Sequence, residues 1–182
     1  ELVLESKIKF NDSILKGLPY TFEISDLIKE YSETEIIDLK RQYSALFEVG
    51  DEGPPAPIRE DLFLSQPAKL REDLVRFYDY FGYTLNDEFQ WQMDHLSIEI
   101  EFMHFLIFQE LESNDNKLSF QLGQLDFSEK HLVNWIPDLS ATINRLGSGD
   151  IYSKIVVELN NFLLIDNNWQ KETINSIHKT GS

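Results

Sequence analysis

The longest apolar stretch in the chain follows the pair Asp94-His95. Every residue of Phe102–Phe108 except His104 is apolar. The run is too long for one buried strand, and a helix that is apolar nearly all round belongs in the middle of a bundle. Asp94 is a candidate N-cap, and Glu99 places negative charge near the helix start, where the dipole favours it. We therefore expect a central buried helix with an acidic beginning.

Most of the remaining chain carries apolar residues at helical spacing. The segments with this pattern are 25–31, 36–47, 67–81, 118–125, 128–143, 151–163 and 169–178. The stretch Asp51–Pro57 holds three prolines and predicts an extended loop, whereas residues 1–24 predict no clear element. There is no internal repeat and no alternation of strands with helices. The sequence thus predicts an all-α fold, a single-domain bundle of about seven or eight helices with short loops.

Three local signals predict where helices begin or break. Ser32 and Glu35 have the spacing of a capping box ahead of the helix over 36–47. Pro137 lies inside the pattern over 128–143 and predicts a kink or a division into two helices. Asn167-Asn168 predicts a break between the last two helical segments.

The connection over 83–93 carries three large apolar side chains, those of Phe89, Trp91 and Met93. So many apolar groups in a short loop have two interpretations. They pack against the bundle, or they form the floor of a pocket at the start of the Asp94 helix.

Composition narrows the classes of function. The 182 residues suffice for one domain, and a formal net charge of −16 repels nucleic acid and anionic membranes while attracting cationic partners. Cys is absent, which excludes disulfides, thiolate nucleophiles and Cys-ligated metals and fits a reducing compartment. No apolar run approaches the roughly 20 residues that span a membrane. We expect no stable membrane insertion and no export signal in this sequence.

One short motif suggests metal chemistry. Glu101 and His104 form an E-x-x-H that places a carboxylate and an imidazole on one helix face. Di-iron helical proteins need this motif twice, and Glu129-Lys130-His131 has the wrong spacing for a second copy. The chain also lacks a nucleophile elbow and a phosphate-binding Gly loop. An iron or manganese enzyme that uses Glu101 and His104 is therefore an alternative that the sequence supports weakly, and the residues leave other enzymatic functions unsupported without excluding them.

An ordered set of motifs narrows the function further. Asp-His-Leu precedes E-x-E-F-M and an apolar run, and ahead of them lie a Pro-Pro-x-Pro loop and the helical sequence L-V-R-F-Y-x-Y-F-G. The segments concerned are Tyr43–Phe47, Gly53–Pro57, Leu74–Gly82, Asp94–Phe108, His131–Trp135 (H-L-x-x-W) and Ile151-Tyr152. Together, over about 32–165, they resemble the TorD/DmsD/NarJ redox-enzyme maturation chaperones. The sequence around residues 77–82 and 101–104 is most similar to that of the chaperones of type II DMSO-reductase-family molybdoenzymes.

The resemblance implies a cytoplasmic, cofactor-free, TorD-like helical chaperone over residues 1–182. Such a protein binds the twin-arginine signal peptide or N-terminal region of a molybdopterin-dependent oxidoreductase catalytic subunit and assists cofactor insertion before export. A receptor for two arginines and an apolar segment needs carboxylates beside apolar side chains. The residues that we expect to meet the arginines or shape their site are Asp94, His95, Glu99 and Glu60. The residues that we expect to contact the apolar segment or to line the site are Trp91, Tyr43, Leu46, Phe47 and Pro55.

Two departures from the family pattern concern this site. Trp91-Gln92-Met93 stands where the family often has a Pro before the Asp-His pair. A Trp that is common near the proline loop is either replaced by Ile58 or absent. Residues 1–31 match poorly. A structural subunit of a redox complex is a further alternative, and either a monomer or a helix-swapped dimer is compatible with the resemblance.

Overall fold

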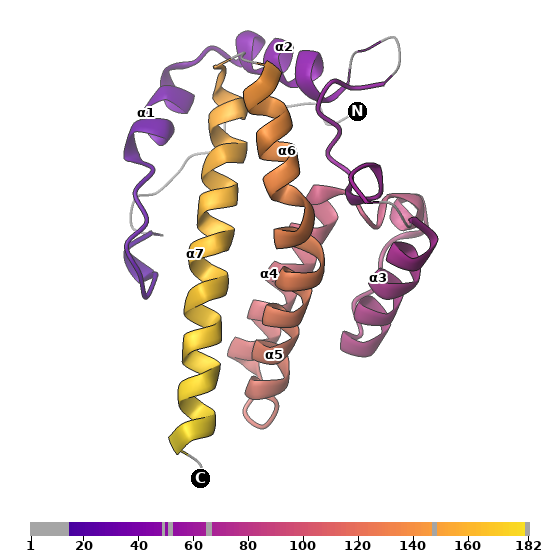
Figure 1. Cartoon of the computed structure of the whole chain (residues 1–182), viewed down its shortest axis with the longest axis vertical. Coiled ribbons are helices and arrows are strands. Elements are labelled where there is room, and N and C mark those ends of the chain that lie inside the picture. Colours follow the sequence, from indigo (N-terminus) through magenta and orange to yellow (C-terminus); the bar gives the residue numbers. More distant parts are fainter. Residues whose placement is uncertain (1–14, 49, 51–52, 65–66, 147–148, 181–182) are drawn as a thin grey trace. The chain divides into compact units, whose positions relative to one another are not determined.

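The computed structural model describes residues 15–48, 50, 53–64, 67–146 and 149–180 (Figure 1). Within these ranges there are seven α-helices and no strand, which confirms the predicted all-α class. The helices are α1 (Ser25–Glu33), α2 (Ile36–Phe47), α3 (Pro67–Phe81), α4 (Leu96–Glu112), α5 (Lys117–Phe127), α6 (Val133–Leu146) and α7 (Ile151–Thr180). In the described part of the chain, no helix combines the length and the apolar character needed to cross a bilayer.

The chain divides into two compact units, each built from two stretches of sequence. The first unit comprises the chain up to Pro57 together with Leu139–Phe162, and the second comprises Ile58–Asp138 together with the chain from Leu163 onward. Helices α6 and α7 therefore contribute to both units. The prediction of a single domain over 1–182 stays a prediction.

The first unit packs α1 and α2 against the beginning of α7. Leu39 of α2 is fully buried and forms a core cluster with Tyr31 of α1 and Ile151 of α7. The side-chain oxygen of Gln42 accepts a hydrogen bond from the backbone N–H of Ile151 at 3.0 Å. This bond satisfies one of the free donors at the start of α7 and joins the two helices.

The predicted capping box is wrong. Ser32 lies inside α1, where its hydroxyl donates to the carbonyl of Ile28 four residues earlier. Glu35 is itself the N-cap of α2 and makes no side-chain capping bond. Since α2 begins only at Ile36, Ser32 does not occupy the N-cap position that a capping box requires.

The second unit has an aromatic core where α3, α4 and α5 meet. The ring of Phe102 on α4 lies 4.7 Å from the rings of Tyr78 on α3 and Phe127 on α5, measured between centroids. Both Phe102 and Phe127 are fully buried. The Tyr78 hydroxyl donates to the carbonyl of Met93 at 2.8 Å, which fixes the segment before α4 against α3. The apolar run in the sequence thus supplies the centre of this core.

The outer surface of α4 departs from the prediction of a helix buried all round. Ile107, Phe108 and Leu111 are 43%, 51% and 72% exposed. Only one face of α4 packs against neighbouring helices. The apolar run therefore serves two purposes, a core on one face and an apolar surface on the other.

Two predicted divisions of helices are absent. Pro137 lies within a continuous α6, because the hydrogen bond that it cannot donate would reach only Val133, the first residue of that helix. The change of helical hydrogen bonding comes earlier, in a π-helical turn over Ser128–Leu132. Helix α7 also continues through Asn167, which is buried and donates to the Ser128 hydroxyl at 3.4 Å. With this partner, the Asn167 side chain does not compete for the backbone of its own helix.

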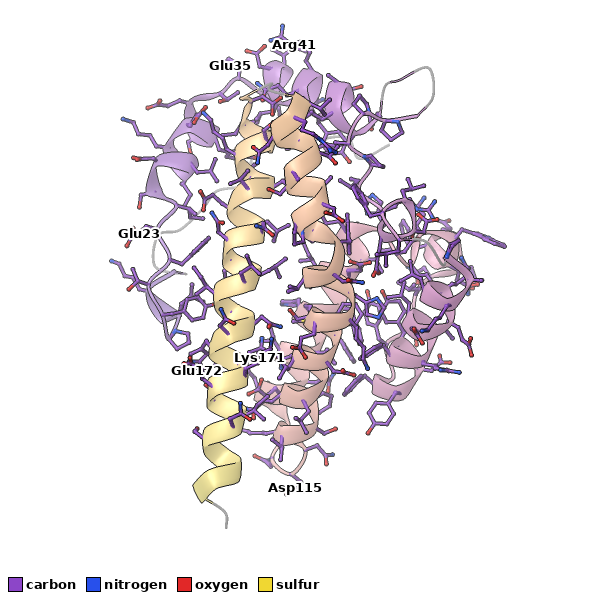
Figure 2. All side chains as sticks on the ribbon, in the orientation of Figure 1. Glu23, Glu35, Arg41, Asp115, Lys171 and Glu172 are labelled. Carbon is purple, nitrogen blue, oxygen red and sulfur yellow. The ribbon has the colours of Figure 1, made fainter. Side chains whose placement is uncertain are left out.

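Charged groups cover the outside of the helices. Figure 2 labels Glu23, Glu35, Arg41, Asp115 and Glu172, all of them exposed. The acidic excess of the sequence is thus displayed to solvent.

Candidate functional site

The Asp94-His95 pair is held in place by a short backbone pairing. Residues 58–60, which continue the proline loop, run antiparallel to residues 94–96, and Arg59 and His95 form an isolated β-bridge. The N–H of Glu60 donates to the carbonyl of Asp94 at 3.0 Å, and the N–H of Leu96 donates to the carbonyl of Ile58 at 3.1 Å. This pairing brings two segments that are distant in sequence together at the start of α4.

The Asp94 carboxylate holds the guanidinium of Arg59. The Arg59 Nη2 atom donates to Oδ1 and Oδ2 of Asp94 at 2.9 and 3.2 Å, and the Arg59 Nε atom donates to Oδ2 at 3.3 Å. Asp61 adds a contact at 3.2 Å between its Oδ2 and the same Nη2, and its N–H donates to Asp94. Burial raises the pKa of Asp94, but the hydrogen bonds and charge of Arg59 outweigh it, so its pKa lies below the ordinary value. Burial and the nearby Asp94 raise the pKa of Asp61.

The predicted N-cap is therefore wrong by one residue. His95 is the N-cap of α4, and its Nδ1 accepts from the N–H of Ser97 at 3.2 Å. Nδ1 also lies 2.7 Å from the Ser97 hydroxyl. Burial lowers the pKa of His95, which favours the neutral ring that can accept at Nδ1. Asp94 is unavailable as a cap because its carboxylate is turned toward Arg59.

The residues Arg59, Asp61, Asp94 and His95 form a site that we call the Asp94 corner. Behind it lies a buried polar network. Glu60 and His131 approach to 3.0 Å between Oε2 and Nδ1, and the indole N–H of Trp135 donates to Oε2 of Glu99 at 3.0 Å. All four of these side chains are buried. Burial, followed by the charge of Glu60, raises the pKa of Glu99 well above its ordinary value and favours the neutral acid. The His and Trp of the H-L-x-x-W motif thus contact the two glutamates that the sequence analysis had assigned to peptide binding.

The structure separates the predicted acidic residues into two kinds. Asp94 lies at the edge of a cavity of about 260 Å³ whose lining includes Arg59, Asp61 and Arg71. Glu60 and Glu99 are fully buried and do not line this cavity. Sequence reasoning missed Arg59 and Asp61 as parts of the site, although they flank Glu60 directly in the chain.

The large apolar side chains of the loop before α4 also differ in their exposure. Met93 is buried, as the packing interpretation expects, whereas Trp91 is 75% exposed. The guanidinium of Arg71 lies over the Trp91 ring at 4.9 Å from its centroid and donates to the carbonyl of Gln90 at 2.9 Å. Trp91 is therefore a surface group held by a cation, close in sequence to Asp94.

The remaining predicted residues, Tyr43, Leu46, Phe47 and Pro55, belong to the first unit. The N–H of Ala56 donates to the carbonyl of Leu46 at 2.9 Å, which fastens the proline loop to the end of α2. Leu46 and Phe47 are buried, and Phe47 packs edge-on against Tyr43. Leu46 and Phe47 therefore present little apolar surface, whereas Tyr43 is half-buried and Pro55 is exposed.

The described residues offer no further ligands for the proposed metal pair. Glu101 and His104 both lie on the exposed part of α4. Across the described ranges, no group of three or more His, Asp or Glu side chains is arranged to hold a metal.

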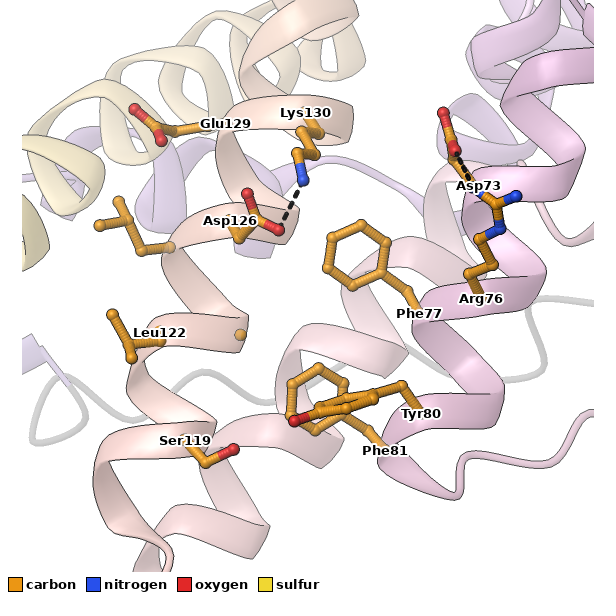
Figure 3. Close-up of a pocket in the computed structure, with 12 residues that line it drawn as sticks. Asp73, Arg76, Phe77, Tyr80, Phe81, Ser119, Leu122, Asp126, Glu129 and Lys130 are labelled. Atoms are coloured by element: carbon orange, nitrogen blue, oxygen red, sulfur yellow. Dashed lines mark hydrogen bonds and ion pairs between the residues drawn. The ribbon is translucent and has the colours of Figure 1, made fainter.

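A larger groove, which the sequence did not predict, lies between α3 and α5 (Figure 3). It measures about 720 Å³, with Phe77, Tyr80 and Phe81 on one side and Leu122 on the other. Gly123 permits this geometry, because a Cβ there would lie 2.3 Å from the Phe81 ring. Ion pairs line its rim, Asp126 with Lys130 at 2.7 Å and Asp73 with Arg76 at 3.8 Å.

Comparison with known proteins gives the family. The family model for the nitrate reductase delta subunit matches residues 13–141. The chain belongs to this family. The match confirms the resemblance to the NarJ/TorD type of chaperone that the motifs indicated.

Three relatives share parts of the sequence. The chain is 33% identical over 112 residues to the perchlorate reductase assembly chaperone protein of Dechloromonas aromatica (strain RCB). This alignment covers 59% of the chain and 50% of the relative. The chain is 29% identical over 133 residues to the chlorate reductase assembly chaperone protein of Ideonella dechloratans, covering 65% and 68%. The selenate reductase assembly chaperone protein of Thauera selenatis is 28% identical over 115 residues, covering 60% of each. The matches thus span half to about two thirds of these relatives. No solved structure matches the chain.

Proposed function

We propose that this protein is an assembly chaperone, not an enzyme, for the catalytic subunit of a molybdenum-dependent reductase. Membership of the family supports this, together with three relatives that are named as assembly chaperones of perchlorate, chlorate and selenate reductases. The protein acts in the cytoplasm and holds its client until the cofactor has been inserted.

We further propose that it recognises the twin-arginine signal peptide, or the N-terminal region, of that client at the Asp94 corner. The observation that carries this proposal is the bidentate contact between Asp94 and Arg59, with Asp61 on the same guanidinium nitrogen. Two carboxylates already contact one guanidinium here, so their geometry suits the binding of arginine. An arginine of the client pairs with these carboxylates by sharing them with Arg59 or displacing it.

The other predicted residues take different parts in this proposal. His95 and the exposed Trp91 form the edge of the site, where the indole ring offers an aromatic face to the peptide. Glu60 and Glu99 act from behind, because their buried contacts with His131 and Trp135 position the backbone that carries Asp94. The part of Tyr43, Leu46, Phe47 and Pro55 in recognition stays a prediction.

Calorimetric binding to the purified full chain tests the recognition proposal. The probe is a synthetic peptide with an Arg-Arg pair followed by an apolar segment, compared with Gln-Gln and Lys-Lys versions. We expect the Gln-Gln peptide to bind at least about tenfold more weakly, since each guanidinium–carboxylate pair contributes roughly 1.5–3 kcal/mol. The Lys-Lys peptide is expected to lie between the two, because an ammonium cannot bind a carboxylate in bidentate fashion.

Two variants locate the interaction. Asp94→Asn is expected to weaken the Arg-Arg peptide to the level of the Gln-Gln peptide. Asp79→Asn, an exposed change on α3 of equal charge, serves as the control and should bind like the parent. Equal affinity for the Arg-Arg and Gln-Gln peptides would overturn the proposal of arginine recognition, and an unaffected Asp94→Asn variant would move the site elsewhere.

A further inference from the structure

Helix α4 presents an apolar stripe to solvent. Ile100, Ile107, Phe108 and Leu111 are 41%, 43%, 51% and 72% exposed, with the exposed His104 between them. Their spacing along the helix places all five on one face, which we call the α4 stripe. At about 1.5 Å per residue the stripe is roughly 16 Å long. A patch of this kind marks an interaction surface more often than a chance exposure.

The charged side chains that α4 itself places beside the stripe are negative. Glu101 and Glu112 are exposed at its two ends, and α4 contains no Lys or Arg. Neither glutamate forms an ion pair with any other residue that the structure describes. The groove in Figure 3 differs, because its carboxylates Asp73, Asp126 and Glu129 are already paired with Arg76, Lys130 and Lys171 respectively.

These charges argue against a second copy of this chain as the occupant. In an antiparallel pairing of two α4 stripes, Glu101 of one copy would face Glu112 of the other, and in a parallel pairing each glutamate would face its equivalent. Each copy also carries a net charge of −16. Like charges directly opposed across an apolar contact disfavour association. The partner that fits is an apolar helical segment with cationic residues and no acidic ones.

The α4 stripe also continues the Asp94 corner. Asp94 immediately precedes α4, and the N-cap His95 contacts Ser97, which lies on the same exposed face one turn before Glu101. We propose that the α4 stripe binds the apolar segment that follows the arginine pair of the client's N-terminal region. This inference rests on the proposed function, because it takes the arginines to lie at Asp94. The segment packs as a helix of about eleven residues along α4, by the geometry of ordinary helix–helix contact.

The test uses two sets of variants of the full chain and two peptides. The stripe variant is Ile107→Gln/Phe108→Gln/Leu111→Gln, and the control is Tyr80→Gln/Leu122→Gln, which removes exposed apolar groups from the groove in Figure 3. One peptide carries Arg-Arg and about eleven Leu and Ala residues, the length that matches the stripe. The other carries Arg-Arg and a Gly/Ser segment of the same length. Circular dichroism and sedimentation equilibrium check folding and oligomeric state.

We expect the stripe variant to bind the Leu/Ala peptide at least about tenfold more weakly than the parent, while the Gly/Ser peptide binds both proteins equally. The groove variant should match the parent with either peptide. If the parent binds the Leu/Ala peptide and the stripe variant binds it equally well, the stripe assignment fails while the proposed function stands. A selective loss in the groove variant, or a parent dimer that the stripe substitutions dissociate, would also overturn the assignment. If the parent binds neither peptide, the proposed function itself fails.

Discussion

Replacing the buried Glu99 by Gln is expected to stabilise the protein at neutral pH. Glu99 is fully buried beside Glu60, and burial with that neighbouring charge raises its pKa well above the ordinary value. Folding at neutral pH therefore requires either a proton on Glu99 or a second charge in the core. Gln resembles the protonated acid in shape, accepts from the Trp135 indole with its oxygen and carries no charge.

The difference in the free energy of unfolding between Glu99→Gln and the parent depends on pH. The folded-state pKa of Glu99 is raised, so its contribution to stability is fully present below the unfolded-state value of about 4.3 and is lost as the pH rises toward the folded-state pKa. The loss is about 1.4 kcal/mol for each pH unit between those two values. The advantage of Glu99→Gln is thus near zero at about pH 4 and grows with pH until the pH reaches the raised folded-state pKa of Glu99.

Urea unfolding followed by circular dichroism at several pH values between about 4 and 7 measures this difference. The matched control is Glu112→Gln, an exposed change at the other end of α4, which should shift the free energy of unfolding by no more than about 0.5 kcal/mol at any pH. A Glu99→Gln variant that is less stable than the parent at pH 7, or a difference that does not grow with pH, would refute the reasoning.

Three further changes test the packing. Gly123→Ala places a Cβ against the Phe81 ring and should lower the free energy of unfolding by about 1–3 kcal/mol, seen as a lower urea midpoint. Leu39→Ala opens a cavity in the core of the first unit and should lower the free energy of unfolding by about 2–5 kcal/mol. The control Ile37→Ala, on the exposed side of α2, should lower it by less than about 0.5 kcal/mol. Similar losses in the two variants would contradict the burial of Leu39. Trp135→Phe removes the indole donor from a buried carboxyl group and should cost about 1–3 kcal/mol by the same assay; an unchanged midpoint would show that the bond contributes nothing.

Periodicity alone was sufficient for much of the fold. The helices over 36–47, 67–81 and 151–163 follow from apolar spacing, because each buries one stripe against its own unit. The failures have a common cause. Ser32, Pro137 and Asn167 all look like starts or breaks in a local window, yet tertiary partners or helix position decide their effect. The π-helical turn before α6 has no signal in hydrophobic spacing.

The site was less predictable because charge pairing is not local. The sequence drew attention to Asp94, but its partner Arg59 lies 35 residues earlier and meets it only through the bridge between the two segments. Glu60 was expected at the surface, since nothing in the chain near it shows that His131 will cover it. The outward face of α4 was missed for a related reason, because an apolar sequence does not show whether its partner belongs to the same chain.

The most direct test of the central claim is affinity capture of the tagged full chain from its native cells, with mass spectrometry of the retained proteins. We expect to recover a molybdenum-reductase catalytic subunit that still carries its N-terminal signal peptide and lacks a full complement of cofactor. Recovery of the mature, cofactor-loaded enzyme as a stable complex would contradict this expectation and indicate a structural subunit.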